Sequence, residues 1–154
     1  MPGSWPAADF PNLNIRNHQI TSPATRIYNC LAWAAGKDNR RWDPAIPYYW
    51  PKGIPRERTL DALAMVYESE GFSVCIGGLL EPGIEKVALF AIDTGGRKVP
   101  THAARQLESG EWTSKLGDCE DISHATYGAV SGPAYGDVVV FLSRQRPAAT
   151  HQPI

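Results

Sequence analysis

The stretch KVALFAIDTGGRKVPTHAARQL, residues 86–107, predicts two β-strands joined by a tight turn. Its first part, KVALFAID (86–93), is apolar and rich in residues that favour strands. The TGG that follows (94–96) is typical of a turn, and VPTHAARQL (99–107) resumes an extended pattern. This stretch therefore predicts an antiparallel hairpin.

Further strands are expected on both sides of this hairpin. EWTSKL (111–116) can pair with VPTHAARQL across the turn at Glu108-Ser109-Gly110. FSVCI (72–76) is a short strand candidate, and GDVVVFLS (136–143) has the clearest strand pattern in the chain. We expect an antiparallel sheet of about four to five strands.

Two helices are expected before the sheet. In ERTLDALAMVYESEGF (57–72) the apolar residues recur at helical spacing, and Gly71 ends the pattern. RIYNCLAWAAG (26–36) offers two helix starts, one at Ser22 before Pro23 and one at Asn29, and Gly36 suits the C-terminal end. If Asn29 is the N-cap, Cys30 is the first residue of the helix.

Helices that precede an antiparallel sheet predict the α+β class. A chain of 154 residues suits one domain. We expect an extended N-terminal arm over residues 1–21, the folded domain over 22–144 and a disordered tail over 145–154.

Composition argues against several kinds of partner. The net charge is −1 and no run of five or more basic residues occurs, so we expect no nucleic-acid binding. No apolar run approaches the ~20 residues of a membrane span, and the first residues do not resemble a signal peptide. Three cysteines do not suggest a disulfide framework, so the expected compartment is the cytoplasm.

Cys30 and His102 are the residues with the most chemical potential. A thiol becomes a nucleophile when a helix N-terminus or a neighbouring imidazole increases its thiolate character. Cys30 opens a predicted helix, and His102 is expected near the start of a strand, where its side chain can project from a sheet edge. The simpler alternative is that Cys30 is a buried core residue, which is common for an isolated cysteine.

A cysteine at the start of a helix, followed by a sheet with histidine early in a strand, resembles the papain-like cysteine hydrolases. The NlpC/P60 and CHAP amidases are the small bacterial branches of this group. Residues 102–114, HAARQLESGEWTS, resemble the NlpC/P60 pattern, in which a third polar residue follows the histidine by about twelve positions. The chain also resembles uncharacterised small bacterial proteins with a similar NC.AWA, HAARQL and W.SKLG pattern.

This resemblance implies a papain-like α+β fold with Cys30 as nucleophile and His102 as general base. Ser114, or alternatively Asp118, would orient His102. The sequence departs from the family in Asn29-Cys30-Leu31-Ala32, where Asp-Cys-Ser-Gly is usual, and in His102-Ala103-Ala104.

The function expected from these residues is a small thiol hydrolase or acyl transferase. It would act on an amide, isopeptide or related acyl bond in a peptide or other amide-containing substrate, without a cofactor or metal. The residues expected to line the substrate site are Asn29, Trp33, Trp42, Tyr49, Trp50, Arg105 and Lys115. Arg41 is a further candidate for binding a substrate carboxylate.

Two other functions remain open at this point. Aromatic residues and prolines over 42–50 suit a peptide groove or protein partner, so the chain could be a non-catalytic binding or immunity-type module. Cys119 and His124 have tolerable spacing for zinc ligands, with Cys30, Cys75 and His102 able to join only through tertiary contact.

Overall fold

One antiparallel sheet of seven strands makes up most of the computed structural model, which describes residues 3–147. The strand order is β1-β6-β5-β4-β3-β7-β2. The strands are β1 His18–Ser22, β2 Ser73–Cys75, β3 Ile84–Thr94, β4 Arg97–Gln106, β5 Trp112–Lys115, β6 Asp121–His124 and β7 Asp137–Gln145. The helices are α1 Cys30–Ala34 and α2 Leu60–Glu68, with short 3-10 turns η1 Ala7–Asp9 and η2 Tyr127–Val130.

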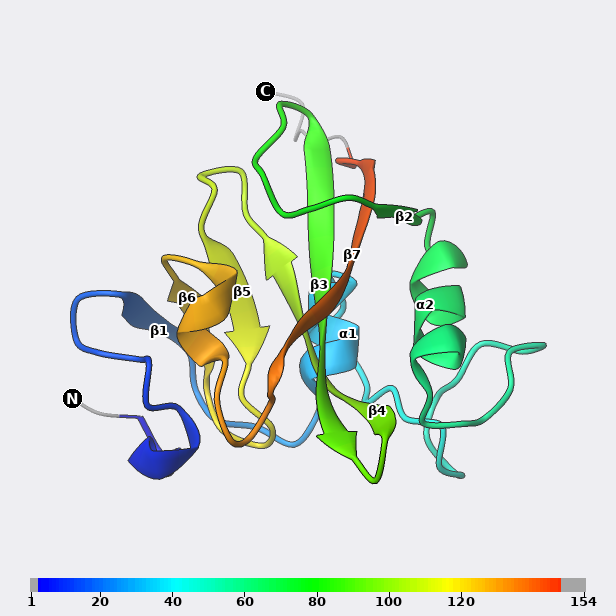
Figure 1. Ribbon diagram of the computed structural model, residues 1–154, viewed down its shortest axis with the longest axis horizontal. Helices are drawn as coiled ribbons and strands as arrows, with labels where there is room; N and C mark the ends of the chain where they lie inside the picture. Colours follow the sequence, from blue (N-terminus) through cyan, green and yellow to red (C-terminus); the bar gives the residue numbers. More distant parts are fainter. Residues whose placement is uncertain (1–2, 148–154) are drawn as a thin grey trace.

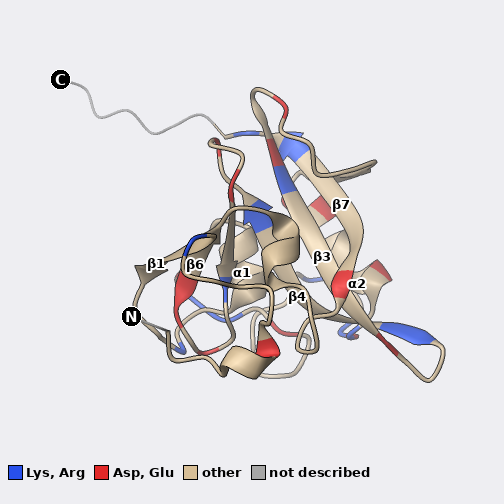
Figure 2. Ribbon diagram, turned by 60° about the vertical axis from the view of Figure 1, so that its left-hand side comes forward, with Lys and Arg blue, Asp and Glu red and all other residues tan. Residues whose placement is uncertain are grey.

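The predicted hairpin forms the middle of the sheet. β3 and β4 pair from Val87↔Arg105 to Thr94↔Arg97, and β7 pairs with the other side of β3. Residues Glu85–Ala91 of β3 are buried in succession because both faces of this strand are covered. In Figure 2 the hairpin projects from the body of the molecule, with Lys98 paired to Asp93 at 3.3 Å near its end.

The expected α+β, papain-like architecture, with N-terminal helices packed on four to five strands, is wrong. The molecule is mainly β: the sheet has seven strands, α1 has five residues and only α2, with nine, is a helix of ordinary length. Figure 1 shows α1 behind the sheet and α2 at its side. The Ser22-Pro23 segment begins no helix, since α1 starts at Cys30.

Two strands at one side of the sheet, β1 and β6, account for the difference between the expected four to five strands and the seven observed. β1 and β6 pair from His18↔His124 to Ser22↔Asp121, and their sequences, HQITS and DISH, are polar and lack an apolar strand pattern. β1 crosses the expected boundary between arm and domain at residue 21, so the end of that arm belongs to the sheet. β7 extends one residue past the other boundary, and residues 148–154 of the expected tail lie outside the described residues.

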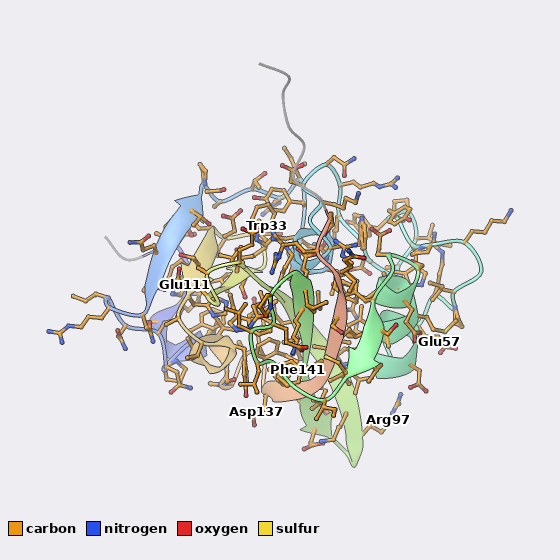
Figure 3. The ribbon with its side chains drawn as sticks, turned by 90° about the horizontal axis from the view of Figure 1, so that it is seen from above. Trp33, Glu57, Arg97, Glu111, Asp137 and Phe141 are labelled. Atoms are coloured by element: carbon orange, nitrogen blue, oxygen red, sulfur yellow. The ribbon has the colours of Figure 1, made fainter. Side chains whose placement is uncertain are left out.

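The sheet separates two apolar clusters. One cluster contains α1, α2 and the β-residues Val87, Leu89 and Ala103; the other contains Ala88, Phe90 and Ala104. Figure 3 looks along the sheet, with Trp33 on the α1 side and Phe141 on the other. This alternation determines which face each functional side chain of β4 reaches.

The described residues contain no helix that is long and apolar enough to cross a membrane.

Candidate functional site

A cavity of about 190 Å³ lies where α1, the segment 41–59 and β4 meet. It includes both residues that the sequence singled out, Cys30 and His102. The other lining residues are Asn29, Leu31, Arg41, Asp43, Pro44, Trp50, Glu57, Arg58, Thr59, Leu63, Pro100, Thr101, Gly117 and Tyr135. The fold thus brings residues more than seventy positions apart to one hollow.

Cys30 is the first residue of α1 because Asn29 caps the helix. The Asn29 Oδ1 accepts hydrogen bonds from the backbone N–H of Ala32 at 3.4 Å and of Trp42 at 3.0 Å. Its Nδ2 donates to the Trp42 carbonyl at 2.7 Å, which joins α1 to the following loop. The predicted Asn29 cap is therefore confirmed, and it fixes the position of the thiol.

The Cys30 thiol is protonated at neutral pH. Burial raises its pKa, and this effect outweighs the stabilisation of the thiolate by the backbone N–H of Ala103 and the charge of Arg41. The expected thiolate-forming environment is therefore absent at Cys30. Attack by this sulfur requires a base that removes the proton during the reaction.

His102 lies in the interior of the sheet, not at a sheet edge. β4 carries one extra residue here, since Phe90 pairs with His102 and Ala91 with Pro100, leaving Thr101 without a β3 partner. Such a bulge bends a strand and changes where its side chains point. The His102 ring is fully buried and stacks on the Tyr135 ring, with centroids 3.9 Å apart and an interplanar angle of 4°.

A chain of hydrogen bonds determines which nitrogen of His102 carries hydrogen. His124 Nδ1 lies 2.7 Å from the Thr126 carbonyl, which can only accept, so this nitrogen is the donor. The neutral His124 then accepts at Nε2 from the Ser114 hydroxyl, 2.8 Å away. The Ser114 oxygen in turn accepts from His102 Nε2–H at 2.9 Å.

This chain, His102–Ser114–His124–Thr126, leaves His102 Nδ1 as a bare lone pair. Nδ1 is buried and has no hydrogen-bond partner among residues 3–147. Burial holds the pKa of His102 well below its ordinary value, with the nearby His124 adding to the effect, so the ring is neutral. Burial likewise lowers the pKa of His124 to about 4. His102 is thus a neutral base whose Nδ1 accepts no hydrogen bond within the described fold.

Cys30 and His102 approach the cavity from different faces of β4. Ala103 belongs to the apolar cluster on the α1 side, and its backbone N–H acts to lower the pKa of the Cys30 thiol, whereas the His102 ring packs with Phe90 of the opposite cluster. Within the described part of the chain no hydrogen bond joins Sγ to Nδ1. The two groups share a cavity, but no direct hydrogen bond joins them among the described residues.

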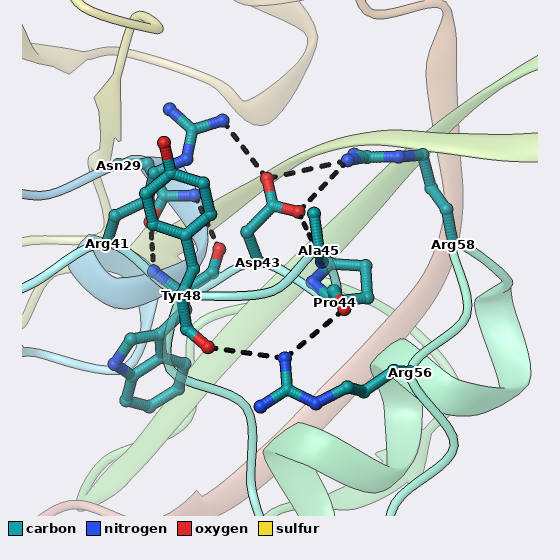
Figure 4. A network of polar contacts seen from close by, with 9 residues as sticks. Asn29, Arg41, Asp43, Pro44, Ala45, Tyr48, Arg56 and Arg58 are labelled. Carbon is teal, nitrogen blue, oxygen red and sulfur yellow. Dashed lines mark hydrogen bonds and ion pairs between the residues drawn. The ribbon is translucent and has the colours of Figure 1, made fainter.

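The loop after α1 forms one wall of the cavity and is held by a buried carboxylate (Figure 4). Asp43 accepts from Arg41 Nη2 at 3.0 Å, from Arg58 Nη2 at 3.4 Å and from the Ala45 N–H at 2.9 Å. Burial acts to raise the pKa of Asp43, but the Ala45 N–H and the two arginines outweigh it and lower the pKa overall. Arg56 ties the same loop through the carbonyls of Pro44 and Tyr48.

The aromatic residues expected at the substrate site serve mainly as core. Trp42 is 3% exposed and packs against Tyr49, which is partly buried beneath Arg40. Only Trp50 lines the cavity. Trp33 lies outside it and donates from Nε1 to Thr113.

The expected charged residues are also placed elsewhere. Lys115 is fully buried and donates to the carbonyls of Thr25, Gly117 and Cys119, and Arg105 donates to the Trp33 carbonyl. Asp118 is exposed and pairs with Arg26 at 3.5 Å, so it does not orient His102. Ser114 contacts His102 as its spacing predicts.

The zinc alternative gains no support from the positions of its residues. Across residues 3–147 no group of three or more His, Cys, Asp or Glu side chains could hold a metal ion. His124 belongs to the hydrogen-bond chain, and the three cysteines are free and partly buried.

Three residues of the site were not found from the sequence. His124 was considered only as a zinc ligand, and its contact depends on the β5–β6 pairing. Tyr135 precedes β7 and carries no local motif, and no local motif marks Arg58 as a partner of Asp43. No short-range pattern marks these three contacts, because each joins segments distant in sequence.

Comparison with known proteins places the chain without assigning an activity. No curated protein and no solved structure matches it. Residues 19–143 match a domain of unknown function, DUF7689, and this match spans the sheet from β1 to β7. The chain therefore belongs to the DUF7689 family.

Proposed function

We propose that this protein is a thiol hydrolase or acyl transferase that acts on an amide, isopeptide or related acyl bond. Cys30 is the nucleophile and His102 the general base. The observation that carries the proposal is the free, buried Nδ1 of His102 in the same cavity as Cys30. A buried acceptor without a partner destabilises a fold by about 1–3 kcal/mol, so a role in chemistry explains its retention better than packing does.

The reaction begins from two neutral groups. Cys30 Sγ attacks the acyl carbon while its proton passes to His102 Nδ1. The C–N or C–O bond then breaks, Nδ1 returns the proton to the leaving amine or alcohol, and a thioester remains on Cys30. Water or an acceptor amine attacks the thioester and restores the Cys30 thiol, and the choice between these two separates hydrolysis from transfer.

Ser114 acts on this reaction through His102. Its hydroxyl accepts from Nε2–H, which keeps the lone pair on Nδ1 and stabilises the imidazolium that forms during attack. Because no hydrogen bond joins Cys30 to His102 among the described residues, proton transfer requires this contact to form when substrate fills the cavity, as catalytic contacts often tighten in the substrate complex. A reducing compartment such as the cytoplasm suits this chemistry, because all three cysteines are free.

The test is acetylation by p-nitrophenyl acetate, a neutral activated ester, located by peptide mass spectrometry. The chain contains its own controls, since Cys30, Cys75 and Cys119 are all free and partly buried. We expect acetylation at Cys30 to outpace that at the other two, with a burst of p-nitrophenolate that Cys30→Ala abolishes and Cys75→Ala preserves. Replacement of His102 by Gln should remove the preference for Cys30, and circular dichroism checks that this variant is folded.

Equal acetylation of the three thiols would overturn the proposal, as would full acetylation of Cys30 in folded His102→Gln. Cys30 would then be a packing residue, and the binding-module alternative would be the better description.

A further inference from the structure

Two arginines that line the cavity have more hydrogen-bond donors than the buried carboxylate of Asp43 uses. Arg41 and Arg58 both bind Asp43, yet each guanidinium has five N–H groups. Arg58 bonds only through Nη2 among the described residues, and Arg41 bonds only through its own Nη2. The Arg41 Nε is buried and has no partner within residues 3–147.

Asp43 fixes the two guanidinium groups in place. It is 4% exposed, and its low pKa keeps it ionised, so it is a permanent anchor for both arginines. Tyr48 adds a second support, since the Arg41 guanidinium lies 5.1 Å from the centroid of its ring. Guanidinium groups that are already positioned by Asp43 lose little conformational entropy when they bind a second carboxylate.

These donors lie within electrostatic reach of the reacting sulfur. The charge of Arg41 acts on Cys30 to lower its pKa, and both arginines line the cavity that contains the thiol. Glu57 also lines the cavity, but it is exposed and makes no ion pair in the described part of the chain, so water and salt screen its repulsion. The exposed Arg58 is screened in the same way, whereas the buried Nε of Arg41 is screened less.

We infer that the cavity takes a substrate with a carboxylate close to the reacting acyl group, and that Arg41 and Arg58 bind this carboxylate. The substrate class is then an anionic amide or isopeptide, such as a peptide with an acidic residue or a free carboxyl end beside the reacting bond. This inference rests on the proposed function and adds a specificity to it.

A pair of alkylating reagents tests the inference without knowledge of the natural substrate. Iodoacetate and iodoacetamide deliver nearly the same group to a thiol, but only iodoacetate carries a carboxylate. The measured quantity is the ratio of the two alkylation rates at each cysteine, at low salt. We expect this ratio at Cys30 to exceed that at Cys75 and Cys119 by about tenfold, the equivalent of one charge-assisted hydrogen bond.

Arg58→Gln should bring the ratio at Cys30 down to that of the other two thiols. Arg56→Gln is the matched control, since it removes the same charge from a residue that, within residues 3–147, bonds only to the Pro44 and Tyr48 carbonyls and does not line the cavity. The ratio should remain high in this variant, and it should fall as salt is added to the wild type.

A Cys30 ratio equal to that of Cys75 and Cys119, or one that Arg58→Gln and Arg56→Gln change alike, would overturn the inference. Failure of the proposed function is distinguishable, because it appears as loss of preferential acetylation by the neutral ester. Preferential acetylation of Cys30 without any preference for iodoacetate would refute the carboxylate specificity alone.

Discussion

A single hydroxyl fixes the hydrogen positions of two buried imidazoles. Ser114 Oγ lies 2.9 Å from His102 Nε2 and 2.8 Å from His124 Nε2, and all three side chains are fully buried. The hydroxyl has one hydrogen to donate, so it can donate to only one ring, and any other ring bonded to it must donate to its oxygen. The Thr126 carbonyl resolves the choice, and the free lone pair falls on the ring that reaches the cavity.

Ser114→Ala should destabilise the protein and slow the acetylation of Cys30. Both imidazoles lose their Nε2 partner, and we expect the free energy of unfolding to fall by about 2 kcal/mol or more in urea denaturation. Ser123→Ala is the control, because Ser123 is nearly buried on β6 but makes no side-chain hydrogen bond among the described residues, and it should cost about 1 kcal/mol or less. A Ser114→Ala variant as stable and as reactive as Ser123→Ala would contradict the role of the hydroxyl.

At this scale the sequence could indicate reactive residues but not their state. The resemblance of residues 102–114 to the NlpC/P60 pattern predicts the contact of His102 with Ser114, and the two residues do lie on paired strands. It could not show that burial raises the pKa of Cys30, since burial depends on the packing of α1 against β4. The sequence could not show the hydrogen bond between His124 and Ser114 either, since this bond requires the pairing of β6 with β5.

At the scale of elements, α1 depends more on its cap than on its length. A helix of five residues has little stability of its own. Asn29 links it to the following loop, because its side chain both donates a hydrogen bond to the Trp42 carbonyl and accepts one from the Trp42 N–H. That loop contributes Asp43 and the two arginines to the cavity wall. One side chain thereby positions the thiol and the opposite wall together.

Asn29→Ala should cost about 2–3 kcal/mol of unfolding free energy, through the lost cap and the lost bonds to Trp42. Thr59→Ala is the matched control, because the Thr59 side chain caps α2 through Ala62 N–H at 3.1 Å and makes no other hydrogen bond in the described chain. It should cost about 1 kcal/mol. Equal costs for the two variants, measured by chemical denaturation, would show that the link to the loop contributes nothing.

Local patterns predicted the elements with strong periodicity. α2 and the strands β2, β3, β4, β5 and β7 lie where their residues predict them, and the positive φ of Gly36 and Gly71 fits the two predicted helix ends. β1 and β6 carry polar residues that face buried partners, as in the contacts of Asp121 with Thr21 and Tyr28. These strands form because they pair with neighbouring strands, and the residue pattern of each strand alone does not predict them.

At the scale of the whole molecule, the sheet is covered on both faces around β3 and β4. This double cover places His102 and His124 in the second apolar layer, where a charged imidazole is strongly disfavoured. The expected α+β class failed for the same reason, since it assumed a smaller sheet with helices as the main cover. The base of the proposed site is neutral because of the global fold and not because of its neighbours in sequence.

The stability of the protein should fall as the pH decreases from about 6.5 to about 4. In this range the unfolded chain protonates His102 and His124, whereas the folded chain keeps them neutral, so the unfolded state binds more protons. The pKa of His124 in the fold is about 4, and we expect this residue alone to account for about 3 kcal/mol. Thermal or urea unfolding at several pH values measures the slope.

His124→Asn serves as the comparison for this slope. The variant should be less stable near neutral pH, and its stability should depend less on pH between about 6.5 and 4, because one titrating group is gone. An identical slope in wild type and variant would contradict the burial of a neutral His124.

The most direct test of the site is the position of the hydrogens on these two histidines. Proton–nitrogen correlation NMR of the imidazole rings, at a pH of about 7, distinguishes the two neutral tautomers and the charged form. We predict hydrogen on Nε2 of His102, with Nδ1 bare, and hydrogen on Nδ1 of His124. A His102 that carries hydrogen on Nδ1, or on both nitrogens, would have no lone pair for the Cys30 proton and would contradict the proposed chemistry.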